Sequence, residues 1–158
     1  MRNILIGLSG GINSMAVLCW LAEQQEKPSE LHLFYAHFEE HSDDTLPFVL
    51  DGVEFAKNNF ENVIYKQTNN SILKFFEEQK MIPHPVISPC SRVLKIEPVN
   101  NYMKENGIEI DLVGYVKHEL LRRTSRQKKS NESGIKKMYP IGEFTDEWCF
   151  EMVDKHIG

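Results

Sequence analysis

The chain has 158 residues, 41% hydrophobic and 26% charged, which is typical of one globular domain with a buried core. No stretch reaches the roughly 18 uninterrupted apolar residues of a membrane span, and the first residues lack a targeting pattern. We therefore expect a cytoplasmic protein with no membrane partner. The formal charge of −5 argues against a protein that coats nucleic acid.

The predicted elements alternate along the chain between short apolar strands and longer helix-periodic segments. The pattern predicts strands over residues 3–8, 31–36, 62–66 and 110–115, with a short fifth strand around 137–139. It predicts helices near residues 13–26, 44–59, 70–80, 91–106, 117–126 and 145–157.

This alternation predicts a three-layer α/β fold, a doubly wound sheet of about five mainly parallel strands with helices on both faces. We expect the strand order 3-2-1-4-5 and a single domain over residues 1–158. In such sheets, ligands bind beyond the carboxyl ends of the strands, where the strand order reverses.

A glycine-rich turn, LSGGINS, lies at the carboxyl end of the first strand. Gly10 and Gly11 permit backbone angles that a Cβ would forbid, and they leave amide groups unobstructed at the start of the next helix. Those amides and the positive end of the helix dipole form an anion site, most often for phosphate. Ser9 and Ser14 add hydroxyl donors. A plain strand-to-helix connection is the alternative interpretation.

SGGINS resembles the SGGxDS signature of the PP-loop superfamily, the ATP pyrophosphatases and adenine-nucleotide α-hydrolase-like proteins. The resemblance implies that the loop grips the phosphates of ATP or of a related adenine nucleotide. It assigns nucleotide binding to residues Ser9, Gly10, Gly11, Ile12, Asn13 and Ser14.

Four further segments are similar, in order, to the phosphoadenosine phosphosulfate (PAPS) reductase branch of that superfamily. They are FEEHSDDTLPFVLDGVEF, SPCSRVLKIEPVNNYM, LVGYVKHELLRR and YPIGEFTDEWCFEMVDKHI. The third corresponds to a Gly-x-x-x-x-Glu…Arg element, which adds Gly114 to the expected nucleotide contacts. The resemblance extends over nearly the whole chain.

Charged side chains in these segments are the candidate catalytic groups. Arg92 and Lys95 lie three residues apart on one predicted helix face and could hold successive oxygens of a polyphosphate or sulfate. Glu119 and Arg122, assigned to catalysis, and Arg123, assigned to nucleotide binding, follow the fourth strand. A solvated helix face or a surface ion pair is the alternative for each.

The role of His37 and the dependence on a metal ion stay open. His37 follows the second strand, where it could lie near the ribose or base or could face water. The family pattern usually has an aspartate where this chain has Asn13, which carries no charge for Mg²⁺. We therefore predict no protein metal site, although Mg²⁺ could accompany the nucleotide.

The cysteines fit the family's usual chemistry poorly. Cys19, Cys90 and Cys149 are far apart and odd in number, so the spacing predicts neither a disulfide framework nor a paired-cysteine metal site. We expect Cys19 and Cys149 to be core residues. Cys90 precedes a predicted helix beside Arg92, where a thiol pKa would fall; a structural role in shaping the turn is the alternative. The chain ends at HIG without the Glu-Cys-Gly-(Leu/Ile)-His motif that supplies the family's catalytic thiol.

A basic segment over residues 117–137 carries eight lysines and arginines against two glutamates, an excess of six positive charges. It could guide a nucleic-acid backbone or could be a solvated loop.

The leading hypothesis is an enzyme acting on ATP or a sulfonucleotide toward an unknown acceptor; the alternatives are a catalytically silent nucleotide-binding module and a PP-loop enzyme that thiolates or modifies nucleic acid. A homodimer stays open, and the short chain suggests a compact genome such as that of a phage.

Overall fold

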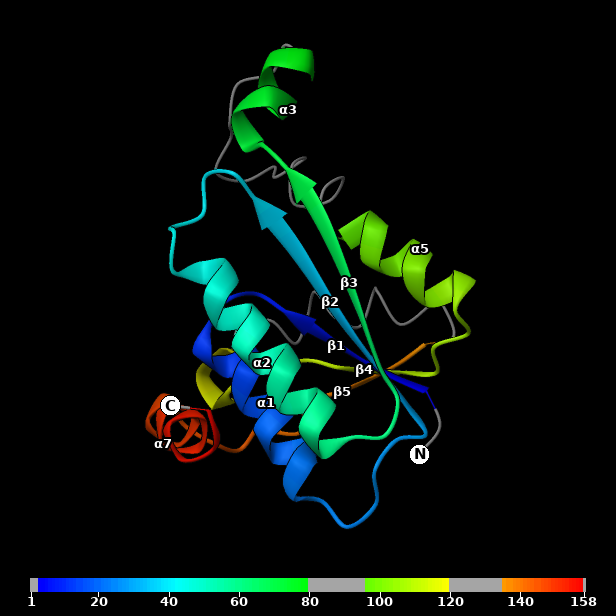
Figure 1. Ribbon diagram of the computed structural model, residues 1–158, viewed down its shortest axis with the longest axis vertical. Helices are drawn as coiled ribbons and strands as arrows, with labels where there is room; N and C mark the ends of the chain where they lie inside the picture. The colour runs from blue at the N-terminus through cyan, green and yellow to red at the C-terminus, as the bar shows by residue number, and fades with distance from the viewer. Residues whose placement is uncertain (1–2, 80–95, 120–134, 158) are drawn as a thin grey trace.

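A five-stranded parallel sheet forms the centre of the computed structural model, which describes residues 3–79, 96–119 and 135–157 (Figure 1). The strand order is β3-β2-β1-β4-β5, and all four pairings are parallel. The strands are β1 (Asn3–Leu8), β2 (Glu30–Phe38), β3 (Val63–Asn70), β4 (Ile110–Leu112) and β5 (Lys136–Met138). The predicted fold class and strand order are confirmed.

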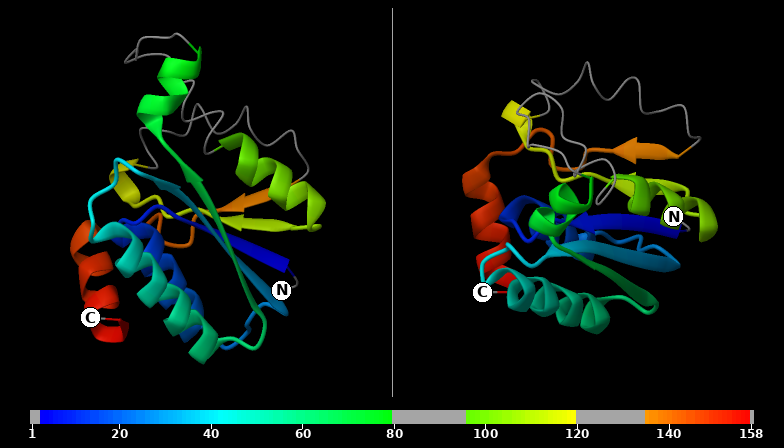
Figure 2. Two further views of the ribbon diagram at one scale, coloured as in Figure 1. Left: turned by 45° about the horizontal axis from the view of Figure 1, so that its top comes forward. Right: turned by 90° about the horizontal axis from the view of Figure 1, so that it is seen from above.

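Helices cover both faces of this sheet (Figure 2). The described helices are α1 (Ile12–Glu23), α2 (Thr45–Asn59), α3 (Ile72–Gln79), α5 (Glu97–Glu105) and α7 (Asp146–His156). Helices α1, α2 and α7 pack on one face, and α5 lies on the other. Helix α3 continues from β3 and projects beyond the end of the sheet (Figure 1).

The two faces are filled to different extents. On the first face, Ile4, Ile6 and Leu8 of β1 join a large cluster of buried residues with the apolar side of α1. On the α5 face, the buried cluster among the described residues is smaller and consists of Leu5, Phe34, Met103, Ile108 and Ile135.

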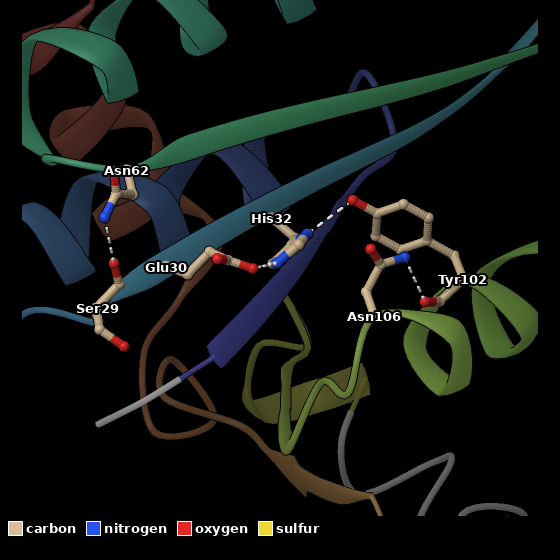
Figure 3. Close-up of polar contacts among 6 residues, drawn as sticks. All are labelled: Ser29, Glu30, His32, Asn62, Tyr102 and Asn106. Carbon is tan, nitrogen blue, oxygen red and sulfur yellow. Dashed lines mark hydrogen bonds and ion pairs between the residues drawn. The ribbon is translucent and has the colours of Figure 1, made fainter.

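A buried polar network fixes α5 against β2 (Figure 3). His32 is fully buried, and its Nε2 contacts the Glu30 carboxylate while its Nδ1 lies 2.7 Å from the Tyr102 hydroxyl. Because a carboxylate only accepts, a neutral His32 donates from Nε2 and its Nδ1 accepts from Tyr102. Burial and the nearby Glu30 charge raise the pKa of Tyr102, which keeps this donor protonated. The network anchors α5 at a fixed place over the sheet.

Some predicted boundaries differ from those observed. The fourth strand is predicted over 110–115 but ends at Leu112, because the chain beyond it turns toward α1. The third strand is predicted to end at 66 but continues to Asn70, since all eight of its residues pair with β2. The helix predicted over 91–106 is observed from Glu97, and residues 91–95 lie outside the described part.

Candidate functional site

A cavity of about 770 Å³ opens between α5 and the sheet. It is lined by β1 and the turn after it, the first turn of α1, β4 and the residues after it, one residue each of β5 and α7, and the amino-terminal part of α5. Its volume lies within the range of small-molecule sites. Seven of the predicted site residues line it: Ser9, Gly11, Ile12, Asn13, Ser14, Gly114 and Glu119.

The glycine loop has the backbone geometry expected of an anion site. Gly10 has a φ of 82°, and a Cβ built there would lie 2.4 Å from the Thr45 Cγ2 atom. Gly11 is the N-cap residue of α1 in an extended conformation, so it has no side chain to accept from the first-turn N–H groups. The first turn of α1 also lacks acidic residues. The amino end of α1 is therefore open to a negatively charged group.

The two loop serines hydrogen bond within the loop. The Ser9 N–H donates to the Ser14 hydroxyl at 3.2 Å, and the Gly11 N–H donates to the Ser9 hydroxyl at 3.2 Å. The Ser14 hydroxyl also lies 3.4 Å from the Gly11 carbonyl oxygen. These bonds hold the turn in shape. The hydroxyls would have to exchange them to donate to a ligand.

Asn13 and Glu119 meet across the entrance to the cavity. The Asn13 carboxamide donates from Nδ2 to the Glu119 Oε1 atom at 2.9 Å. The two residues are 106 positions apart in sequence, and their bond joins the start of α1 to the helical residues 117–119 after β4. Glu119 thus orients Asn13 in this structure.

Gly114 lets the chain after β4 approach α1 closely. A Cβ on Gly114 would lie 3.0 Å from the Ser14 N and Cα atoms and 3.1 Å from the Asn13 carbonyl carbon. Because these are backbone atoms, a side chain would push the β4 turn away from the phosphate loop. The glycine predicted from the resemblance therefore has a clear packing reason.

His37 does not line the cavity but belongs to a hydrogen-bonded chain at the carboxyl end of β2. The Phe38 N–H donates to the His41 Nδ1 at 3.4 Å, so this nitrogen is an acceptor and the Tyr35 hydroxyl, 2.8 Å away, donates to it. The Tyr35 oxygen then accepts from the His37 Nδ1 at 3.0 Å. A neutral His37 ring therefore has an unprotonated Nε2, and its predicted contact with the ribose or base stays a prediction.

Several predicted residues lie outside the described part of the chain: Arg92, Lys95, Arg122, Arg123 and Cys90. The other two cysteines are confirmed as core residues, since Cys19 and Cys149 are fully buried. Burial raises the pKa of Cys19 to about 12 and that of Cys149 to about 11. Neither thiol is activated for nucleophilic attack.

The inner end of the cavity contains residues that the sequence reasoning missed. Gly7 of β1, Asp111 of β4 and Lys137 of β5 line it on the α5 face. Burial raises the pKa of Asp111 to about 6, and the positive charge of Lys137 opposes that rise. A carboxylate inside the otherwise apolar run IDLV, and a glycine inside the apolar run NILIGL, were the available signals.

Within residues 3–79, 96–119 and 135–157, no three histidine, cysteine, aspartate or glutamate side chains gather where they could hold a metal ion. In the same residues, none of the helices has the length and apolar character needed to cross a membrane.

The sheet order, the glycine turn after β1 and the cavity beside it define a doubly wound α/β protein with a site at the carboxyl ends of its strands. The model of the phosphoadenosine phosphosulfate reductase domain family matches residues 3–157. The chain belongs to this family. No curated protein sequence matches it significantly.

Solved structures with the same fold have different activities. A phosphoadenylyl-sulfate reductase from Candida auris in complex with phosphate shares 14% identity, with a TM-score of 0.61 over 98% of this chain and 73% of that one. The U34-tRNA thiolase NcsA from Methanococcus maripaludis with its 4Fe-4S cluster shares 15% identity, with a TM-score of 0.66 over 98% and 56%.

The NMN synthetase from Francisella tularensis shares 13% identity, with a TM-score of 0.63 over 99% of this chain and 62% of that one. The chain thus spans 56% of the thiolase, 62% of the synthetase and 73% of the reductase. At these identities the likeness shows the fold, and the activity of this chain has to be argued from its own residues.

Proposed function

We propose that the protein binds an adenine nucleotide, ATP or a sulfonucleotide, with the phosphates on the loop Ser9–Ser14. The observation that carries this proposal is the open amino end of α1 at the wall of a cavity of about 770 Å³. Main-chain N–H groups and the helix dipole there favour a negatively charged group. Membership of the PAPS reductase domain family supports an adenine nucleotide as the source of that charge.

The chemistry that fits this site is electrostatic. Loop amides, together with Arg92, Lys95, Arg122 and Arg123 if they reach the ligand, would stabilise charge as a bond breaks at the α-phosphorus or sulfur. With ATP, the step would transfer the adenylyl group to an acceptor and release pyrophosphate. With a sulfonucleotide, a thiol other than those of Cys19 and Cys149 would have to act, because both of these are buried.

Mg²⁺ would enter with the nucleotide rather than bind to a preformed protein site. Asn13 offers a neutral carboxamide oxygen, and Glu119 already accepts its Nδ2 hydrogen bond. Oxygen ligands of this kind suit a cation that is held mainly by phosphates and water.

Thermal-shift measurements with ATP, AMP, adenosine phosphosulfate and PAPS test the proposal. A ligand at a hundred times its dissociation constant adds roughly 2.7 kcal/mol to the free energy of unfolding. We expect at least one of the four to raise Tm substantially. No shift with any of them would contradict the proposal.

The variant Gly11→Val tests the loop itself. Gly11 has an extended backbone with φ −96°, so valine fits the backbone there, whereas at Gly10 the positive φ and the contact with Thr45 would strain the fold. The valine side chain covers the amides, and we expect the nucleotide shift to disappear. Thr145→Val is the matched control, because it removes the side-chain cap of α7 and should leave the nucleotide shift intact.

Turnover is measured separately, as pyrophosphate or AMP released from ATP with Mg²⁺. Release that depends on an added acceptor would identify an adenylating enzyme. Tight binding without any product would instead define a nucleotide-binding module.

A further inference from the structure

The inner end of the cavity is open because β1 has a glycine at its centre. Gly7 is paired with Phe34 in β2, and a Cβ built on Gly7 would have no atom of the described residues within 4 Å. Every other residue from Ile4 to Leu8 is buried, whereas Gly7 is exposed to the cavity. A glycine in the interior of a central strand weakens the strand, so this opening has no structural benefit.

Two opposite charges lie in the wall of this inner end. Leu5, Asp111 and Lys137 are register neighbours on β1, β4 and β5, so their side chains point to the same face. All three line the cavity. The floor is therefore one apolar side chain beside a carboxylate and an ammonium group.

The Asp111 carboxyl faces the positive charge of Lys137. Within the described residues no hydrogen bond holds it, in contrast to Glu119, which accepts from Asn13 at 2.9 Å. Ile96, Val99 and Asn100 of the α5 segment line the same cavity, and only Asn100 among them offers polar atoms. A partly buried carboxyl without a hydrogen bond is costly unless a ligand supplies the donor.

The inner end and the phosphate loop are separate parts of one cavity. Leu5 and Ser9 are four positions apart, which corresponds to about 13 Å of extended chain. The loop offers amide donors to an anion, while the inner end pairs a negative carboxylate with a positive lysine. A phosphate group suits the first end, and a molecule with both a nitrogen donor and an oxygen acceptor suits the second.

We propose that Asp111, Lys137 and the open floor at Gly7 form a subsite for a small zwitterion of the amino-acid class, with its ammonium group on Asp111. The carboxylate of the same molecule would face Lys137. That this zwitterion is the acceptor substrate rests on the proposed function, whereas the binding of the zwitterion does not. The cavity would then hold the nucleotide phosphates and the acceptor at its two ends.

Calorimetric titration of the whole chain with each of the twenty standard amino acids, with and without AMP, tests this subsite. We expect at least one to bind with a Kd below about 1 mM, the upper end of common enzyme affinities. Asp111→Asn should weaken that binding at least tenfold, which is about 1.4 kcal/mol. Asp51→Asn is the matched control, since Asp51 is an exposed aspartate on α2.

Gly7→Val is the second variant, because it closes the floor without touching either charge. We expect it to abolish amino-acid binding while it remains folded. No binding of any amino acid to the unmodified protein, or equal binding by Asp111→Asn, would overturn the subsite. If no amino acid binds but a nucleotide still raises Tm, the proposed function stands without the subsite. If an amino acid binds but no nucleotide raises Tm, only nucleotide binding is rejected.

Discussion

The two faces of the sheet differ in what their side chains do. The face covered by α1, α2 and α7 is closed by a continuous cluster of buried apolar residues. The α5 face has a small cluster, a buried histidine network and a cavity with Asp111 in its wall. Neighbouring residues of β1 illustrate the contrast, since Ile6 is fully buried on the first face while Gly7 opens on the second. Stability should therefore depend mainly on one face and binding on the other.

The largest expected effect comes from the closed face. Ile6→Ala removes buried methyl groups from β1 and leaves a cavity in the large cluster, which should lower the free energy of unfolding by about 2–5 kcal/mol. Urea denaturation measures this change. The nucleotide-induced rise in Tm should be preserved in the folded fraction. A loss below about 1 kcal/mol would mean that this face is less tightly packed than the structure indicates.

On the open face, Asp111→Asn should change how stability depends on pH. The pKa of Asp111 is raised from 3.8 to about 6, so the folded state holds the proton more tightly than the unfolded state. Wild-type stability should therefore fall as pH rises from about 4 to about 6, by up to about 3 kcal/mol. The variant lacks the titrating carboxyl. Its free energy of unfolding should therefore equal that of the wild type near pH 4 and exceed it at pH 7.

The difference in stability between wild type and Asp111→Asn at each pH isolates the effect of Asp111, because the other carboxylates titrate alike in both proteins. Among the described residues, Lys137 of β5 and Tyr139 just after it interact electrostatically with Asp111, and Tyr115 and Glu119 line the same cavity. Burial raises the pKa of Tyr139, so its hydroxyl stays neutral in this range. Urea midpoints at several pH values measure the effect, and parallel curves for the two proteins would refute it.

Asn13→Asp probes the hydrogen bond between Asn13 and Glu119 at the cavity wall. The change removes the donor that Glu119 accepts from at 2.9 Å and places two carboxylates together. The dipole of α1 offsets part of this cost, so we expect a net loss of about 1 kcal/mol. Mg²⁺ should restore more of the Tm in this variant than in Asn13→Ala, because only the aspartate provides the second carboxylate. Equal responses of the two variants to Mg²⁺ would argue against the pairing.

The sequence predicted the parts of the molecule that depend on neighbours in the chain. The turn at Ser9–Ser14 is recognisable because strand, glycines and helix are contiguous, and the alternation of elements indicates a parallel sheet with right-handed crossovers. The Asn13–Glu119 bond and the Leu5–Asp111–Lys137 row join distant residues, and their pairing depends on register. A shift of one residue in β4 would have turned Asp111 to the other face. The inner end of the cavity was therefore missed.

The smallest expected effect is also the sharpest test of the open face. Gly7→Val adds a β-branched residue to the centre of β1 where no atom of the described residues lies within 4 Å of the new Cβ. Because a glycine in a strand costs roughly 0.5–1 kcal/mol, we expect guanidinium denaturation to show a gain of that size.

Gly107→Val is the control for this gain. Gly107 also has open space around its Cβ position, but its φ of 63° strains a β-branched residue, so this variant should be destabilised. If Gly7→Val were also destabilised, space at the sheet centre would be required by the fold itself. A stabilised variant that no longer binds its ligand would mean that the glycine is kept for binding at the expense of stability, as at other functional sites.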